Sequence, residues 1–280
     1  MRAIREASAG ARIYETASLA ELDEAARTIA SHRTARVVIA GGDGSYMAGV
    51  TALARACGED ALPEIAFAPG GTVSTVARNW GTRDAGRLVH AVVTSTGTTQ
   101  PRPTLRVNDA IGFIFGAGLV ATFFDEYYAS SRQGNAAAAE IVAKIFAGSF
   151  VGSALARKVL TPQPMTLTVD GALLAPKAWS LIAASVVRDL GLHMLLTYRA
   201  GEMLDRVHVI ASPLGPMALG PQMPRVLAGR PRRGRDHLAA LARELVARFP
   251  EETSYVLDGE VLRAREVRVS AGPVITVRSP

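Results

Sequence analysis

Residues 37–45 read V-V-I-A-G-G-D-G-S, and this short stretch constrains the fold more than any other part of the chain. A β-branched apolar run predicts a buried strand that ends at Gly41 and Gly42, and the residues from Tyr46 to Cys57 predict a helix. Glycines between a strand and a helix leave backbone N–H groups that an anion can approach without meeting a Cβ. The stretch therefore predicts an α/β layer with an anion site where the strand ends.

A second strand ends in the same way. Residues 64–68 predict a strand, residues 70–72 read Gly-Gly-Thr, and residues 73–79 predict a short helix. Because the carboxyl ends of neighbouring parallel strands face one crevice, two such loops are expected to line a common ligand site.

The carboxylate between the glycines, Asp43, separates two interpretations. Beside a phosphate it would be repelled, unless a divalent cation lies between them or the carboxylate accepts a proton from a substrate hydroxyl. Both conditions belong to phosphoryl transfer. In the alternative, the glycines form a tight turn in which Asp43 only caps a helix. A P-loop is excluded because no Gly-Lys-Ser/Thr is present, and Met47 stands where G-x-G-x-x-G requires glycine.

The remaining pattern predicts two domains. Residues 1–100 alternate strands and helices, beginning with a strand over Ala11–Tyr14 and a helix after Ser18, which has Glu21 at capping-box spacing, and ending with a helix over 84–94. We expect an α/β N-terminal domain with a parallel sheet, followed over 101–280 by a mostly antiparallel, β-sandwich-like domain with helical insertions.

Within the second domain, the alternating patterns T-L-R-V-N-D-A-I-G-F and M-T-L-T-V-D-G-A-L-L predict two hairpins. Helices are predicted over 119–130, 136–158 and 236–249. Apolar side chains recur at helical spacing in the first two, which favours a core rather than a ligand groove; they are Phe123, Phe124, Tyr127, Ile141, Ile145 and Phe146.

Composition narrows the compartment and the partners. Cys57 is the only cysteine, which excludes a disulfide within the chain, and neither a signal peptide nor an apolar run of membrane-spanning length is found, so a cytoplasmic protein is expected. The net charge of +6 suits phosphate-bearing partners. The segment 229–235, with Arg230, Arg232, Arg233 and Arg235, is a candidate for peripheral contact with the inner membrane face. Charge is the sole argument for nucleic-acid binding, and no nucleic-acid partner is expected.

The order of three motifs carries a family resemblance. G-G-D-G-S at 41–45 is followed by P-G-G-T-V-S-T-V-A-R-N-W-G at 69–81 and, near the end, by L-D-G-E at 257–260. This arrangement resembles the catalytic domain of the diacylglycerol kinase family, which includes bacterial lipid kinases and sphingosine kinases. The resemblance implies an enzyme that uses ATP and Mg²⁺ to phosphorylate a lipid hydroxyl, of diacylglycerol or sphingoid type, and it leaves a homodimer open.

The resemblance also implies roles for individual residues. Asp43 would be a catalytic or metal-linked carboxylate, and Asp258 or Glu260 would act as the base toward the acceptor hydroxyl. Asp189 is the candidate for a Mg²⁺ ligand on the second domain. The residues expected to line the nucleotide are Gly41, Gly42, Gly44, Ser45, Gly70, Gly71, Thr72 and Ser74.

Three departures from the family pattern keep other functions open. Ser74 stands where the family has asparagine, the D-G-x-L-D metal segment is degraded around Asp189, and the family's first strand is expected to be missing ahead of Ala11. One alternative is therefore an NAD kinase, which carries a G-G-D-G loop and a related two-domain plan. The other is a nucleotide- or lipid-binding protein of the same fold with impaired catalysis.

Overall fold

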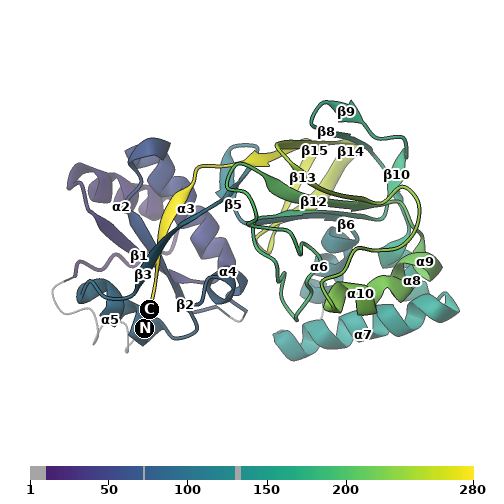
Figure 1. Cartoon of the computed structure of the whole chain (residues 1–280), viewed down its shortest axis with the longest axis horizontal. Helices are drawn as coiled ribbons and strands as arrows, with labels where there is room; N and C mark the ends of the chain where they lie inside the picture. Colours follow the sequence, from purple (N-terminus) through teal and green to yellow (C-terminus); the bar gives the residue numbers. More distant parts are fainter. Residues whose placement is uncertain (1–10, 72, 130–133) are drawn as a thin grey trace.

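The computed structural model describes residues 11–71, 73–129 and 134–280, apart from the side chain of Asn135. Its elements form two bodies that lie side by side (Figure 1). The first body contains α2 (Leu19–Ser31), β1 (Arg36–Gly41), α3 (Asp43–Cys57), the 3₁₀ helix η1 (Glu59–Ala61), β2 (Glu64–Pro69), α4 (Thr75–Asn79), α5 (Ala85–Val93), β3 (Thr98–Arg102) and β16 (Ile275–Ser279).

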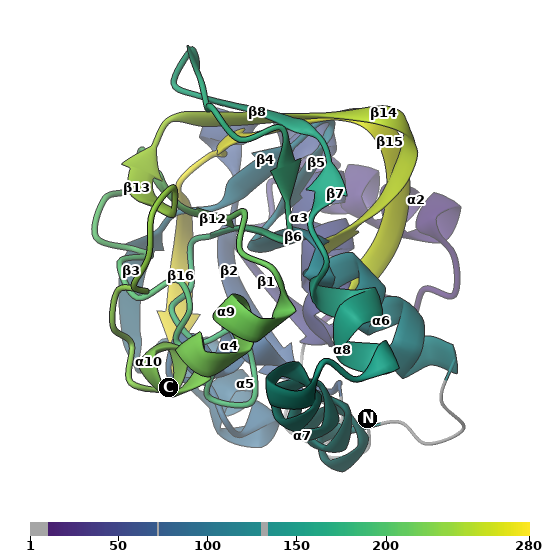
Figure 2. The same cartoon turned by 90° about the vertical axis from the view of Figure 1, so that its right-hand side faces the viewer.

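The second body begins at β4, and a group of helices lies on one side of its large sheet (Figures 1 and 2). Its strands are β4 (Leu105–Val107), β5 (Ala110–Gly112), β6 (Ile114–Gly118), β7 (Gln163–Pro164), β8 (Thr166–Val169), β9 (Ala172–Leu173), β10 (Ala178–Trp179), β11 (Leu181–Ser185), β12 (Val207–Ser212), β13 (Leu238–Ala242), β14 (Glu244–Leu257) and β15 (Glu260–Ala271). Its helices are α6 (Leu119–Ala129), α7 (Asn135–Val151), α8 (Ala154–Leu160), α9 (Pro216–Leu219), the 3₁₀ helix η2 (Gly220–Gln222) and α10 (Met223–Leu227).

The first body is built on a four-stranded sheet in the order β1-β2-β16-β3. Strands β1, β2 and β16 run parallel, and β3 is antiparallel to β16. This confirms the predicted parallel sheet, and α2 begins at the predicted cap, where Glu21 N donates to Ser18 Oγ at 3.2 Å. The predicted boundary at residue 100 stays a prediction, but β16 at the far end of the sequence lies in this first sheet.

The second body is built on an antiparallel sheet whose main path runs β13-β12-β11-β6-β14-β15-β4-β5, with β8 and β9 attached beside β14. Both predicted hairpins are present, as β4–β5 and β8–β9. The longest hairpin joins β14 to β15 through Asp258 and Gly259, whose φ angles of 49° and 89° lie in the left-handed region that such a two-residue turn requires.

The predicted helix over 236–249 is wrong, because this segment forms β13 and the start of β14. Its sequence is rich in Ala, Leu, Arg and Glu, which favour helices, but this preference amounts to less than about 1 kcal/mol per residue. Strand pairing outweighs it: β13 pairs with β12, and β14 pairs with β15 on one edge and with β6 and β8 on the other.

Two further predictions are corrected. Residues 11–16 are exposed and form no strand, since β1 pairs with β2 alone within the described part of the chain. The predicted helix over 136–158 is two helices, because Gly152 adopts a left-handed φ of 63° that ends α7. No single helix in the described ranges has the length and apolar character to cross a membrane; the pair 136–151 and 154–160 would meet that test together but is bent by 101°.

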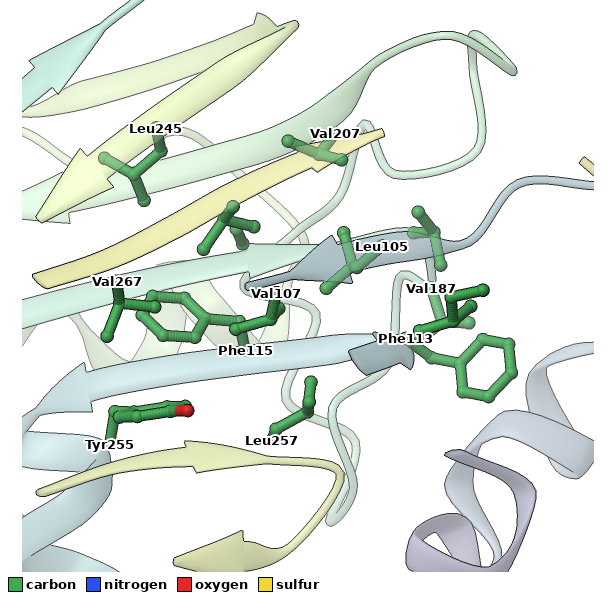
Figure 3. Packing of buried hydrophobic residues seen from close by; sticks show 14 of the residues in the cluster. Leu105, Val107, Phe113, Phe115, Val187, Val207, Leu245, Tyr255, Leu257 and Val267 are labelled. Atoms are coloured by element: carbon green, nitrogen blue, oxygen red, sulfur yellow. The ribbon is translucent and has the colours of Figure 1, made fainter. Parts of the chain in front are cut away.

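The hydrophobic core is continuous between the two bodies, and Figure 3 shows its part in the second body around Phe113 and Phe115. Phe67 and Trp80 come from the first body and Phe113 from the second, and their ring centroids lie 5.3 to 5.6 Å apart. Thr51 of α3 adds two hydrogen bonds to Ile111 of β5, at 2.9 and 3.1 Å. The loops at the ends of β1 and β2 are therefore held at a fixed place against the second body.

Candidate functional site

The two glycine loops pack directly against each other. Gly41 O accepts hydrogen bonds from Gly70 N at 2.9 Å and from Gly71 N at 3.1 Å, and a Cβ on Gly71 would lie only 2.6 Å from Gly42 Cα. The two loops therefore lie together, as the sequence predicts. However, the amides of Gly70 and Gly71 already donate to protein, so these glycines serve the close approach of two backbones.

The first turn of α3 is the part of the loops that remains suited to an anion. Its N-cap, Gly42, supplies no side-chain acceptor, and the first residues of the helix are Asp43, Gly44 and Ser45. The first amides of a helix have no partner within the helix and carry its positive dipole end. Gly41, Gly42, Gly44 and Ser45 thus stay in place as candidate phosphate contacts.

The carboxylate of Asp43 is held by backbone amides of the second loop. Oδ2 accepts from Thr75 N at 2.8 Å and Oδ1 accepts from Val76 N at 2.9 Å, so Asp43 caps α4. Burial raises its pKa, while the two amide bonds and the charge of Arg78 oppose that rise. The capping interpretation is therefore correct as far as it goes, but the same side chain also borders a cavity.

Asp258, in the turn between β14 and β15, is held in the same manner. Its side chain is buried, with Oδ2 accepting from Phe113 N and Oδ1 from Ile114 N, both at 2.9 Å. Burial raises its pKa well above the ordinary value for aspartate, and the nearby charge of Asp43 raises it further. The L-D-G-E and G-G-D-G-S segments thus meet in space.

Glu260 lies on the other side of this meeting point. Its carboxylate borders the first turn of α3, since a Cβ added to Gly44 would lie 2.7 Å from Glu260 Oε1. Tyr128 of α6 donates from its hydroxyl to Gly259 O at 2.8 Å, and so ties α6 to the same turn. Glu260 therefore lies near the candidate phosphate contacts, and it is absent from the cavity lining.

Ser74 has a structural role at the start of α4. It is buried with a left-handed φ of 48°, and its Oγ accepts from Gly71 N at 3.3 Å. The short side chain thereby braces the second glycine loop from within. Thr72, the remaining predicted nucleotide contact, lies outside the described residues.

Asp189, the predicted metal ligand, lies in the loop after β11. Asn79 of α4 connects to it twice, through Nδ2 to Asp189 O at 2.8 Å and through Oδ1 from Asp189 N at 3.1 Å. Its own carboxylate accepts from Gly191 N at 2.9 Å. Within the described ranges no three His, Cys, Asp or Glu side chains gather into a metal site. The contacts seen at Asp189 join the two bodies.

A cavity of about 490 Å³ opens from the two aspartates into the second body. Residues of α6, α7, α8, β11 and the loop 190–196 supply most of its wall. The wall is overwhelmingly apolar, and its aromatic members include Phe123, Phe124, Tyr127 and Phe146. These side chains had been predicted to form core. Their helical spacing is the same in either case, and only the assembled helices leave a space between them.

Among the described residues that line the cavity, only three have ionisable acidic or basic side chains: Asp43, Asp258 and Arg232. The predicted arginine-rich surface is corrected at one position. Arg230, Arg233 and Arg235 are exposed, whereas Arg232 is partly buried. The run of arginines marked the segment 229–235 as a candidate functional region. Nothing in the sequence indicated that Arg232, rather than one of its neighbours, faces the cavity.

Comparisons with known proteins agree with this geometry. The family model Diacylglycerol kinase catalytic domain matches residues 2–102. No curated protein matches the chain. A crystal structure described as that of a "putative diacylglycerol kinase from Bacillus anthracis str. Sterne" is similar with a TM-score of 0.71 at 17% identity, covering 99% of this chain and 89% of that one.

A second crystal structure, of a diacylglycerol kinase from the same organism, is similar with a TM-score of 0.65 at 14% identity, over 100% of this chain and 89% of that one. An NAD kinase from Archaeoglobus fulgidus in complex with ATP reaches a TM-score of 0.45 at 13% identity, over 88% of this chain and 78% of that one, a likeness too low to bear on function. The chain therefore shares its fold with the Bacillus anthracis structures, and its segment 2–102 matches the model of the diacylglycerol kinase catalytic domain.

Proposed function

We propose that the protein is an ATP-dependent lipid kinase that transfers the γ-phosphate to a hydroxyl group of a diacylglycerol-type or sphingoid-type lipid. The observation that carries this proposal is the cavity of about 490 Å³, apolar along its wall and bordered by the carboxylates of Asp43 and Asp258. Its volume falls in the range of small-ligand sites, and each methylene group buried in such a wall contributes about 0.8 kcal/mol. A lipid whose chains fill the cavity would present its hydroxyl to the acids.

The nucleotide phosphates would lie at the first turn of α3. Gly42, Gly44 and Ser45 offer backbone amides there without bulky side chains, and the helix dipole favours an anion. The carboxylate of Glu260 near this turn fits a Mg²⁺ ion bound together with phosphates, because Mg²⁺ is commonly held by one or two carboxylates in such sites. When bound, Mg²⁺ supplies charge neutralisation for the transferred group.

Asp43 is the residue we assign as the proton acceptor. Burial and the charge of Asp43 both raise the pKa of Asp258, so we take Asp258 as the protonated member of the pair and Asp43 as the ionised one. The lipid oxygen forms a bond to the γ-phosphorus, the bond from that phosphorus to the bridging oxygen of ADP breaks, and the hydroxyl proton passes to Asp43. Backbone amides of Thr75 and Val76 keep the carboxylate oriented during this step.

The two alternatives differ in what the cavity would hold. NAD is a polar dinucleotide, and a wall lined by Phe123, Phe146 and Leu181 does not suit it. The protein with impaired catalysis finds some support in Ser74 and in the amides of Gly70 and Gly71 that already donate to Gly41. It would bind ATP and lipid without turnover.

Peripheral membrane contact is part of this proposal, because a lipid must leave a bilayer to enter the cavity. Phe150 and Val151 at the end of α7 support it, with 53% and 81% of their surfaces exposed, one helical turn from the cavity-lining Phe146. Such contact is compatible with a cytoplasmic protein at the inner membrane face. The homodimer and the absence of a nucleic-acid partner stay predictions.

The test is transfer of labelled phosphate from Mg-ATP to a panel of lipids in mixed micelles, with NAD assayed in parallel without lipid. We expect labelled lipid with at least one diacylglycerol or sphingoid acceptor and no label on NAD. Label on NAD alone would replace the proposal with the NAD kinase alternative. ATP binding without transfer to any acceptor would favour the protein with impaired catalysis.

A further inference from the structure

Arg232 stands out because a cation faces an otherwise apolar cavity. It lies in the loop between α10 and β13, and it borders the cavity together with Met223 and Val226 of α10. Its sole hydrogen bond within the described residues runs from Nη2 to Leu238 O at 3.3 Å, which is long for a charged donor. Its Nε is buried and has no hydrogen-bond partner.

No acid compensates this charge. The described residues contain no ion pair to Arg232, and the other cavity carboxylates, on Asp43 and Asp258, each accept two backbone amides. Burial lowers the pKa of Arg232 to about 10, which reflects the cost of keeping a guanidinium away from water. An anion bound beside it would offset that cost.

Two other arginines with a buried, unpartnered Nε show what compensation looks like. Arg206 lies 3.6 Å from a carboxylate oxygen of Asp205 and 4.0 Å from one of Asp170. Arg102 lies over the ring of Trp80, at 5.8 Å from its centroid. Within the described part of the chain, Arg232 forms no ion pair and lies over no aromatic ring, and it is the one of these three arginines that borders the cavity.

The structure assigns Arg232 as the recognition site for an anionic group, a phosphate or a carboxylate, on the lipid that occupies the cavity. The guanidinium offers several N–H donors in a planar fork that matches either group. The inference rests on the proposed function in taking the cavity as the lipid site, and it deepens that function: the acceptor is a diacylglycerol-type lipid that carries an acidic group in addition to its hydroxyl.

Binding without ATP tests this inference separately from catalysis. The probes are cis-parinaric acid and its methyl ester, two fluorescent chains of equal length that differ in one negative charge. We expect the wild-type protein to bind the acid at least about tenfold more tightly than the ester, as a charge-assisted contact in an apolar site provides. In Arg232→Gln this preference should fall to about onefold to twofold, with binding of the ester retained.

Three controls keep the result interpretable. Arg233→Gln changes the neighbouring, exposed arginine by the same substitution and should keep the preference, which excludes a general effect of net charge. Arg232→Lys keeps a cation and should retain most of the preference for the acid. If Arg232→Gln also lost binding of the ester, which Arg232→Lys should keep, a fold defect would be recognised. Inorganic phosphate alone should not displace cis-parinaric acid. It should also not raise the melting temperature of the wild-type protein more than that of Arg232→Gln.

Equal binding of acid and ester by the wild-type protein would overturn the inference, as would an unchanged preference in Arg232→Gln. Protection by inorganic phosphate that depends on Arg232 would identify a site for the free ion and overturn the lipid assignment. A protein that prefers the acid through Arg232 but transfers no phosphate would refute the proposed kinase function alone. A kinase that shows no such preference would refute this inference alone.

Discussion

Asp43 and Asp258 come from loops near opposite ends of the sequence, and their carboxylates lie close enough for the charge of Asp43 to raise the pKa of Asp258. Each carboxylate accepts two backbone amides, one pair at the start of α4 and the other at the start of β6. Backbone atoms therefore fix both acids where the apolar cavity meets the glycine loops. Both side chains are therefore already ordered in the free protein, so a reaction at this site would not have to order them.

Replacing Asp43 with asparagine should abolish most of the activity. Asparagine has one carbonyl oxygen, so it can keep one of the two amide bonds but cannot accept a proton, and we expect a loss of about 10³-fold in kcat. The matched control is Asp84→Asn, which alters the exposed carboxylate that caps α5 by accepting from Arg87 N at 2.7 Å. Initial rates of labelled lipid formation should be unchanged in that control; equal losses in both variants would indicate a purely structural effect.

The pH dependence of kcat should distinguish the two acids. Because burial raises the pKa of Asp43 and the ionised form accepts the proton, activity should be present above that raised pKa and fall as the pH drops through it. Because burial and the charge of Asp43 raise the pKa of Asp258, we expect Asp258 to keep its proton in that range, and Asp258→Asn should retain the acid limb at the same pH. A profile in which Asp258→Asn loses its acid limb would make Asp258 the base instead.

Gly71→Ala should disrupt the contact between the two glycine loops. The added Cβ would lie 2.6 Å from Gly42 Cα, a backbone atom that cannot rotate away, so the loops must separate. We expect a loss of roughly 1–3 kcal/mol in the free energy of unfolding and weaker ATP binding. Gly215→Ala, where nothing lies within 4 Å of the added carbon, should change both far less. Calorimetry and ATP titration measure the two effects, and wild-type ATP affinity in Gly71→Ala would contradict the assignment of this crevice.

The local parts of the fold could be predicted from the sequence, since they depend on neighbouring residues. Ser18 with Glu21 marks the start of α2, and Asp258 with Gly259 marks the turn of the longest hairpin. The segment 238–249 could not be predicted, because its composition favours a helix and strand partners from distant parts of the chain decide its structure.

The candidate site divides in the same way. The glycines at the ends of two strands marked the crevice and predicted an anion site there, and the order of the three motifs carried the family resemblance. The sequence could not decide between core and an apolar pocket within residues 111–160, because Phe123 on α6 and Phe146 on α7 have the same spacing in either case and their exposure to a shared space depends on how the helices assemble. The occupied amides of Gly70 and Gly71 likewise depend on the approach of a second loop.

Acid should weaken the attachment of β16 to β2, because it protonates the glutamate of the ion pair between these two strands. Arg278 of β16 donates from Nη2 to Glu64 Oε2 of β2 at 3.0 Å, and this contact lowers the pKa of Glu64 below its ordinary value of 4.5. The stabilisation is therefore present above pH 4.5 and is lost as the pH falls through the lowered pKa. Glu64→Gln should lose about 2 kcal/mol of unfolding free energy at neutral pH. The difference in unfolding free energy between Glu64→Gln and the wild-type protein should disappear at acid pH.

Denaturant unfolding between pH 7 and pH 3 measures that gap, and Glu251→Gln, at an exposed position of β14, is the control. A gap between wild type and Glu64→Gln that stays constant over this range would show that the ion pair does not hold β16 in the first sheet.

The most direct test of the central claim, that the apolar cavity delivers a lipid hydroxyl to Asp43, is to fill the cavity and vary the acceptor chain. Ala138 of α7 lines the cavity and its neighbour Ala139 is exposed, so Ala138→Trp narrows the space and Ala139→Trp is the matched control. The measurement is phosphate transfer from labelled Mg-ATP to acceptors of one headgroup with long or short chains. We expect Ala138→Trp to lose activity on long-chain acceptors by at least about tenfold, while its activity on short-chain acceptors and the activity of Ala139→Trp stay near wild type. Equal activity of Ala138→Trp and wild type on long chains would contradict it.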